Sequence, residues 1–151
     1  MGIKQVLLVL AVVGLATQSY ADGDTIDEVR NAAPSGSVTV KVPRGIVKFR
    51  GWDESRVRVQ GTLDKQLKGF VFDVRDNETE IWVKVKNSLG SWFGNDGSHL
   101  TIYVPRHSDI VFDGVSSNVD VSGVNGDIDI ETVSGNLTVE NATKRLDVRS
   151  V

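Results

Sequence analysis

The sequence contains no cysteine, only three prolines and only two histidines among its 151 residues. Without cysteine there is neither a disulfide nor a thiolate metal site, so stability must come from burial. The histidines, His99 and His107, stand outside any ligand or triad spacing, and there is no HExxH motif, phosphate-binding glycine loop or nucleophile elbow. These absences predict a protein that is not an enzyme, has no catalytic residues and no metal site, and needs no cofactor.

Long hydrophobic runs are also lacking. The longest, Val6 to Ala16, follows Lys4 as the only early charge and leads into Thr17 to Ala21. A basic start, a short apolar segment and a small-x-small ending are typical of a secretory signal peptide, and about 20 apolar residues would be needed to span a bilayer. We therefore predict a signal peptide over residues 1–21, cleavage before Asp22, and an exported protein, periplasmic or at the cell surface, without a membrane span after cleavage.

The charge balance excludes one class of partner. Residues 1–21 contain only one charged residue, Lys4, so the remainder carries 16 basic and 20 acidic residues, interspersed along the chain. A mildly acidic, mixed surface is not expected to bind nucleic acid. About 130 residues are enough for one domain with a hydrophobic core, and this length favours one domain over two.

A nine-residue repeat occupies the C-terminal third. It reads VSSNVDVSG, VNGDIDIET, VSGNLTVEN and ATKRLDVRS over residues 115–150, and Val151 opens a fifth unit. Apolar residues hold the first, fifth and seventh places, whereas the second to fourth places favour turns. A strand and a tight turn, repeated in this way, predict a β-solenoid-like stack of short strands. If two units make one coil, residues eighteen apart stack, which pairs Asp127 with Arg145 and Glu131 with Arg149 but places Asp129 over Asp147; three units per coil remain an alternative.

The preceding residues alternate with period two, which is typical of strands with one buried face. We expect strands in SVTVKV, IVKFRGW and SRVRVQGTL, a turn at Pro43 to Gly45, and a position for Trp52 near the face of Val47 and Phe49. The segments GFVFDVRD and EIWVKVKN should pair as a hairpin, and a further strand is expected over His99 to Val104. We thus predict an all-β chain with a polar lead-in at 22–36 and a single domain at 37–151, irregular over 37–104 and repetitive over 105–151. Within the lead-in, residues 25–33 suit either a short helix or an edge strand.

Two sets of residues are candidates for binding. Trp92 and Phe93 lie in the glycine-rich segment 87–98, where they either cover the end of the sheet or form a platform for a sugar or protein. Asp129 and Asp147 occupy the outward sixth place of their units. Acids in such rows are usually solvated, although polysaccharide-cleaving solenoids also use them.

The sequence resembles the exported bacterial β-strand-repeat family labelled "putative adhesin", a domain of unknown function. The similarity covers the mature chain, and its most specific elements are Gly51 to Glu54, Tyr103 to Arg106, and the VSG-type units. Membership implies a signal peptide, a β-solenoid-like fold and no established enzymatic activity. The chain differs from the usual form in ending at Val151, in mid-repeat.

These observations favour a non-enzymatic exported scaffold or adhesin-like protein that binds an unknown protein or glycan at the cell envelope. The alternatives are a solenoid-type enzyme that acts on polysaccharide through surface carboxylates, and a purely structural envelope protein. Because an uncapped edge strand invites pairing, we expect either that the chain continues beyond Val151 or that a partner completes the last strand, including edge-strand self-association at this end.

Overall fold

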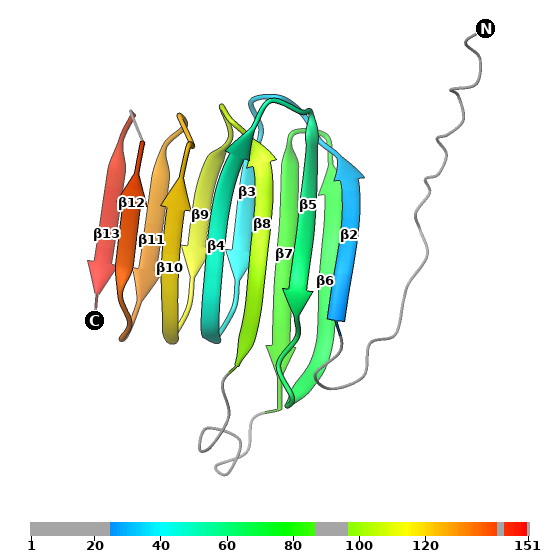
Figure 1. Ribbon diagram of the computed structural model, residues 1–151, viewed down its shortest axis with the longest axis vertical. Helices are drawn as coiled ribbons and strands as arrows, with labels where there is room; N and C mark the ends of the chain where they lie inside the picture. Colours follow the sequence, from blue (N-terminus) through cyan, green and yellow to red (C-terminus); the bar gives the residue numbers. More distant parts are fainter. Residues whose placement is uncertain (1–24, 87–96, 142–143, 151) are drawn as a thin grey trace, which may run out of the picture.

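The computed structural model describes residues 25–86, 97–141 and 144–150, which form two six-stranded sheets packed face to face (Figure 1). The front sheet has the order β12 (Leu137–Glu140), β10 (Ser116–Ser122), β4 (Arg44–Trp52), β8 (Ser98–Pro105), β5 (Arg56–Thr62) and β2 (Thr25–Asn31). The back sheet has the order β13 (Leu146–Ser150), β11 (Ile128–Thr132), β9 (Asp109–Asp113), β3 (Ser37–Lys41), β7 (Glu78–Val85) and β6 (Leu67–Arg75). The prediction of an all-β chain is confirmed. The described residues include no helix that is long and apolar enough to cross a membrane.

The repeat sets the register of the C-terminal strands. Successive strands alternate between the two sheets, and β11, β12 and β13 each pair in parallel with the strand eighteen residues earlier: Val119 lies opposite Leu137 in the front sheet, and Ile110 opposite Ile128 in the back sheet. The fifth and seventh places of each unit therefore point inward, as the alternation of side chains along a strand requires. Of the two alternatives that the sequence left open, two or three units per step, these strands have two.

The turns of the repeat are joined by a ladder that uses the same step. The side chain of Asp109 accepts a hydrogen bond from the N–H of Asp127 at 2.8 Å, and that of Asn118 accepts one from the N–H of Asn136 at 2.8 Å. Gly135, at φ 136°, lies against the backbone of Ser117, where a Cβ would collide with the carbonyl oxygen. The side chain at the fourth place of a unit thus accepts a hydrogen bond from the backbone N–H eighteen residues later, in the turn stacked beside it. Glycine lets these two turns approach closely.

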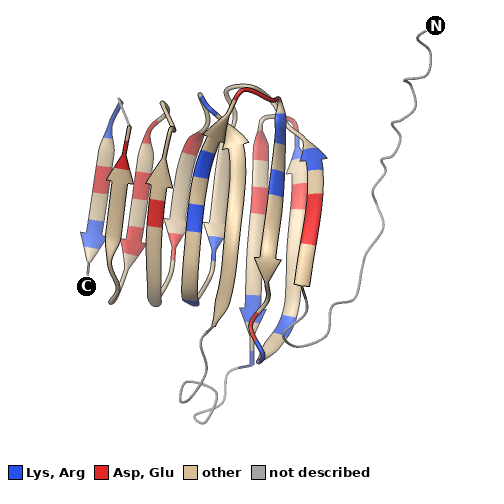
Figure 2. Ribbon diagram, in the orientation of Figure 1, with Lys and Arg blue, Asp and Glu red and all other residues tan. Residues whose placement is uncertain are grey.

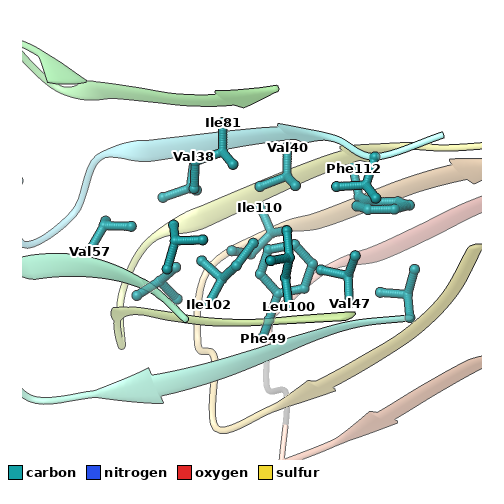
Figure 3. Close-up of a cluster of buried hydrophobic side chains, with 14 of the residues drawn as sticks. Val38, Val40, Val47, Phe49, Val57, Ile81, Leu100, Ile102, Ile110 and Phe112 are labelled. Carbon is teal, nitrogen blue, oxygen red and sulfur yellow. The ribbon is translucent and has the colours of Figure 1, made fainter. Parts of the chain in front are cut away.

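The core lies between the sheets and is made of aliphatic side chains with two phenylalanines. Phe49 of the front sheet meets Phe112 of the back sheet edge to face, with ring centroids 6.2 Å apart. Figure 3 shows these inward side chains from both sheets, among them Val38, Val40, Val47, Ile81, Leu100, Ile102 and Ile110. All of them are almost fully buried, so the two sheets are held together mainly by the hydrophobic effect.

The N-terminal strands continue the stack and then close it. β3 and β4 pair in parallel with β9 and β10, so they form the layer next to the repeats. Beyond them, β5 pairs with β2 and β8, and β6 pairs with β7, all antiparallel; the β6–β7 hairpin predicted from the sequence is confirmed. Residues 25–31, which suited either a helix or an edge strand, form the edge strand β2.

At the outer edge of this part, β2 turns charged side chains toward the interior. Glu28 and Arg30 are linked by an ion pair of 2.8 Å, and Arg30 lies over the ring of Phe72 on β6, 4.8 Å from its centroid. This contact bridges the front and back sheets, and inward charges are one way in which natural proteins protect an edge strand. We call this edge, formed by β2 and β6, the closed end.

The turn predicted at Pro43 to Gly45 is shorter than expected, because Arg44 already belongs to β4. Its side chain is buried and forms two hydrogen bonds with the carboxylate of Asp64, at 2.7 and 2.9 Å. Asp64 also accepts a hydrogen bond from the N–H of Gln66, and its own N–H donates to Ser98. A buried charge needs such partners, so this ion pair ties the start of β4 to the turn between β5 and β6.

The position of Trp52 also differs from the prediction. Val47 and Phe49 point inward. Trp52 lies three and five positions further along the strand, which is an odd step in both cases, so it lies on the outer face, where it is half-buried. The alternation of side chains along β4 is regular enough to account for this. The prediction that Trp52 shares the face of Phe49 was wrong.

The charge pairs between repeats follow the predicted register only in part. Asp129 does lie opposite Asp147, and Glu131 opposite Arg149. However, Arg149 contacts Asp147 at 3.3 Å and Asp129 at 3.9 Å, and Arg145 contacts Asp147 at 3.8 Å. The side chains of Arg145 and Arg149 thus approach the Asp129 and Asp147 carboxylates and offset the repulsion between these two acids.

Candidate functional site

The outer face of the front sheet carries aromatic and arginine side chains where β4, β8 and β5 lie side by side. Tyr103 of β8 is in register with Arg50 of β4 on one side and with Arg58 of β5 on the other. Trp52, two residues after Arg50, adds a second ring. Figure 2 shows the basic bands of β4 and β5 flanking β8, with acidic bands on β10 and β2 beyond them.

The two rings form one continuous contact. The centroids of Trp52 and Tyr103 are 5.1 Å apart, with 32° between the ring planes. The guanidinium of Arg56 lies 5.9 Å from the Trp52 ring, and that of Arg58 lies 5.9 Å from the Tyr103 ring. We call these four residues, together with Arg50, the aromatic–arginine cluster. Cation–π contacts of this length at exposed positions contribute on the order of 0.5 kcal/mol each, so they fix orientation more than they stabilise the fold.

Hydrogen bonds hold the cluster in one arrangement. The indole N–H of Trp52 donates to the carbonyl oxygen of Arg56 at 2.8 Å, which fixes the ring. Arg58 forms a two-point contact with Asp27 at 2.9 and 2.8 Å, and Arg50 contacts Asp120 at 3.2 Å. Two-point arginine–carboxylate pairs are geometrically specific, so the guanidinium groups are held in place before any partner arrives.

The surrounding acids keep the cluster close to electrically neutral. Arg56 is paired with Glu54, and Arg106, at the edge of the cluster, contacts Asp53 at 2.9 Å. The hydrogen bonds from Arg58 lower the pKa of Asp27, and that from Arg106 lowers the pKa of Asp53, so both carboxylates stay charged at neutral pH. The surface therefore offers fixed donors and acceptors beside two rings and does not present a field of one sign.

The residues proposed from the sequence have different outcomes. Trp92 and Phe93 lie outside the described residues. Asp129 and Asp147 lie on the outer face of the back sheet, in a hollow of about 290 Å³ that Val111, Arg145 and Arg149 also line. The structure thus brings the two acids together, with Arg149 in contact with both. Among the described residues, no group of three or more His, Cys, Asp or Glu side chains could hold a metal ion.

The aromatic–arginine cluster was not found from the sequence. Its residues come from three strands, and Trp52 and Tyr103 are far apart in the chain, so their contact depends on the parallel pairing of β4 with β8. One signal was available. Side chains alternate along a strand, so Trp52, at an even-numbered position, belongs to the face opposite Val47 and Phe49. No comparable local signal relates Tyr103 to Trp52.

No family model matches the sequence, and no curated protein matches it. Among solved structures, the chain is similar to a "putative cell adhesion protein" from Clostridium sporogenes, with 10% identity, a TM-score of 0.38, and coverage of 85% of this chain and 100% of that one. It is also similar to a "putative adhesin" from Parabacteroides merdae, with 10% identity, a TM-score of 0.38, and coverage of 88% of this chain and 59% of that one. Both similarities combine low identity with a low TM-score, so neither assigns a role to this chain.

Proposed function

We propose that this chain is a non-enzymatic, exported, adhesin-like protein of the cell envelope, which binds a protein or glycan partner on the outer face of its front sheet. In this proposal the nine-residue units form a β-solenoid-like stack, and that stack is the support for the binding face. The leader-like residues 1–21 support export. The eighteen-residue register of the strands supports the stack.

The observation that carries the proposal is the aromatic–arginine cluster. Tryptophan, tyrosine and arginine are the residues most enriched among those that dominate binding energy at protein surfaces. Here Trp52, Tyr103 and Arg58 are held by contacts within the chain, so a partner would not have to order them on binding, and the entropic cost of association is reduced. A rigid sheet that displays such side chains is suited to recognition.

A binding screen with matched variants tests this proposal. The protein recovered from the periplasm of an expression host would be applied to a glycan array and to immobilised envelope preparations. We expect the combined change Trp52→Ala and Tyr103→Ala to reduce binding at least tenfold. Trp82→Ala is the control, because Trp82 is also half-buried on an outer sheet face, with Lys41 and Lys84 over its ring at 4.9 and 4.3 Å.

Two results would contradict the proposal. A folded wild-type protein that binds nothing in either format would favour a purely structural role. Equal loss of binding in the Trp82→Ala variant and in the cluster variant would mean that the aromatic–arginine cluster is not the binding face. Thermal unfolding followed by circular dichroism would show whether each variant keeps the fold.

A polysaccharide-acting enzyme is the second candidate, because Asp129 and Asp147 line one hollow. Glycoside hydrolysis needs one carboxyl group to donate a proton and the other to act as base or nucleophile. The contact of both carboxylates with Arg149 is an arrangement for two anions, which speaks against this role. Release of reducing sugars that disappears in the Asp129→Asn and Asp147→Asn double variant would establish the enzyme instead.

A further inference from the structure

The edge formed by β12 and β13, which we call the open end, differs from the interior of the stack. At the fifth and seventh places of the unit, Val119 and Val121 are 3% and 0% exposed. The same places on β13 hold Leu146 and Val148, which are 48% and 44% exposed. In the part of the chain that the structure describes, no strand pairs with the free side of β12 or β13. The interior of the stack thus reaches the surface here as a row of apolar side chains beside two unpaired strand edges.

We propose that a second copy of this chain covers the open end, through a twofold axis parallel to the strands. Such an axis keeps every strand at its own level and direction but exchanges the front and back sheets. It therefore places β12 of one copy beside β13 of the other, and the reverse. Because β12 and β13 run in opposite directions (Figure 1), each new pairing is antiparallel.

Charge and apolar character agree with this arrangement. Glu140 ends β12 and Arg145 directly precedes β13, and the end of β12 and the start of β13 lie at the same level (Figure 1). The twofold axis then sets Glu140 of one copy against Arg145 of the other, and both side chains are exposed in a single copy. In the same register Leu137 meets Val148 and Val139 meets Leu146, so the two cores become continuous. Opposite charges and apolar pairs directly across an antiparallel ladder are the stabilising kinds of contact.

The closed end explains why we propose a closed dimer and not a filament. A filament would require the open end of one copy to dock on β2 and β6 of the next. There the inward face of β2 carries Glu28 and Arg30 as well as Ile26, and burying the charged pair against Leu146 and Val148 would cost desolvation energy without new partners. An isologous contact between two open ends avoids that cost and leaves no unpaired apolar edge.

The proposed interface between the two copies is small, so the dimer must be measured over a range of protein concentrations. It involves two short strands per copy, so it buries less than the roughly 800 Å² per partner of a standard interface. We therefore expect a dimer that dissociates on dilution. This dimer does not depend on the aromatic–arginine cluster, so the binding screen and the test below can fail independently.

Sedimentation equilibrium of the exported protein, from about 1 to 500 μM, is the test. We expect the wild-type protein to rise from one to two chain masses over this range, and the Leu146→Lys and Val148→Lys double variant to stay at one. Val111→Lys is the control, because Val111 is 39% exposed on the outer face of β9, away from the open end. A wild type that remains monomeric, or masses that grow beyond two chains, would overturn the proposal, as would dissociation by Val111→Lys.

Charge reversal tests the twofold geometry itself. We expect Glu140→Arg alone, and Arg145→Glu alone, each to weaken the dimer about fivefold through like charges across the new ladder. The double reversal should restore most of the affinity, because the pair is then opposite in sign again. Failure of the double reversal to restore it would exclude pairing of β12 with β13. Since both side chains are exposed, neither change is expected to alter the fold.

Discussion

At the closed end, β2 and β6 finish the core with Glu28, Arg30 and Phe72, whereas at the open end β12 and β13 leave Leu146 and Val148 half exposed in equivalent inward positions. The first half of the chain combines parallel and antiparallel strand pairs and contains a buried ion pair. The second half repeats one unit in parallel register. The comparison shows that the repeat specifies how layers stack, and that closing the stack requires residues outside the repeat pattern.

The largest effect is expected from the ion pair of the first half. Arg44→Ala would leave the Asp64 carboxylate buried without its main partner, which typically costs about 3–5 kcal/mol. Arg75→Ala is the control, because Arg75 and Asp73 form an exposed pair, and we expect a change below about 1 kcal/mol. Urea unfolding measures both. Equal effects would show that the buried pair has no special role.

The second prediction compares two layers of the repeat directly. Val121 and Val148 occupy the seventh place of their units, one fully buried and one at the open end. We expect Val121→Ala to lower the free energy of unfolding by about 2 kcal/mol, since it removes two buried methyl groups and leaves a cavity. Val148→Ala should cost less than about 0.5 kcal/mol in the monomer. Comparable losses at low protein concentration would mean that the open end is already covered.

The dependence of stability on pH provides a third test. Burial alone would raise the pKa of Asp64, but hydrogen bonds from Arg44 and from the N–H of Gln66, with the charge of Arg44, lower it below the ordinary value of 3.8. A carboxyl group whose pKa is lowered by folding contributes stability above its unfolded pKa and loses it as pH falls toward the folded value. We expect stability to fall below about pH 4, and an Asp64→Asn variant to show a flatter acid limb. An unchanged acid limb in that variant would assign the loss to other carboxylates.

The smallest effect concerns the protection of the closed end. Replacing Glu28 and Arg30 by valine would make β2 resemble the edge strands of the open end. We expect little change in the unfolding midpoint but association beyond a dimer, because both ends would then accept a partner. Sedimentation velocity would detect the larger species, and Asp27→Val, which changes the outer face of β2, serves as the control. Absence of larger species would mean that geometry alone protects this end.

The sequence predicted the repetitive part well because the information there is local and periodic. The inward positions of Val121 and Ile130 follow from the places of apolar and turn residues in one unit. The eighteen-residue step depended on comparing charges between units, and three units per coil stayed open. The hydrogen bonds between turns could also have been predicted, because the fourth place of most units is Asp or Asn. The non-repetitive part was harder: Arg44 was assigned to a turn, because nothing near it in sequence indicates a partner twenty residues away.

The candidate site could not be predicted because it depends on strand order. β4 lies between β10 and β8, an order that no local pattern encodes, and this order places Trp52 beside Tyr103. The charge pairs show the same limit at a smaller scale. Register placed Glu131 opposite Arg149 as predicted, yet the length and flexibility of arginine led it to Asp147 and Asp129 instead.

The eighteen-residue register also bears on how such a chain can change during evolution. A duplication of two units adds one strand to each sheet and leaves every later strand on its own side, so the outer surfaces are extended without being rearranged. A duplication of a single unit moves every later strand to the opposite sheet and exchanges the surfaces that those strands display. Gene duplications in even numbers of units should therefore be tolerated, whereas odd numbers would exchange the outer faces that the later strands display and leave the aromatic–arginine cluster, which precedes the repeats, in place.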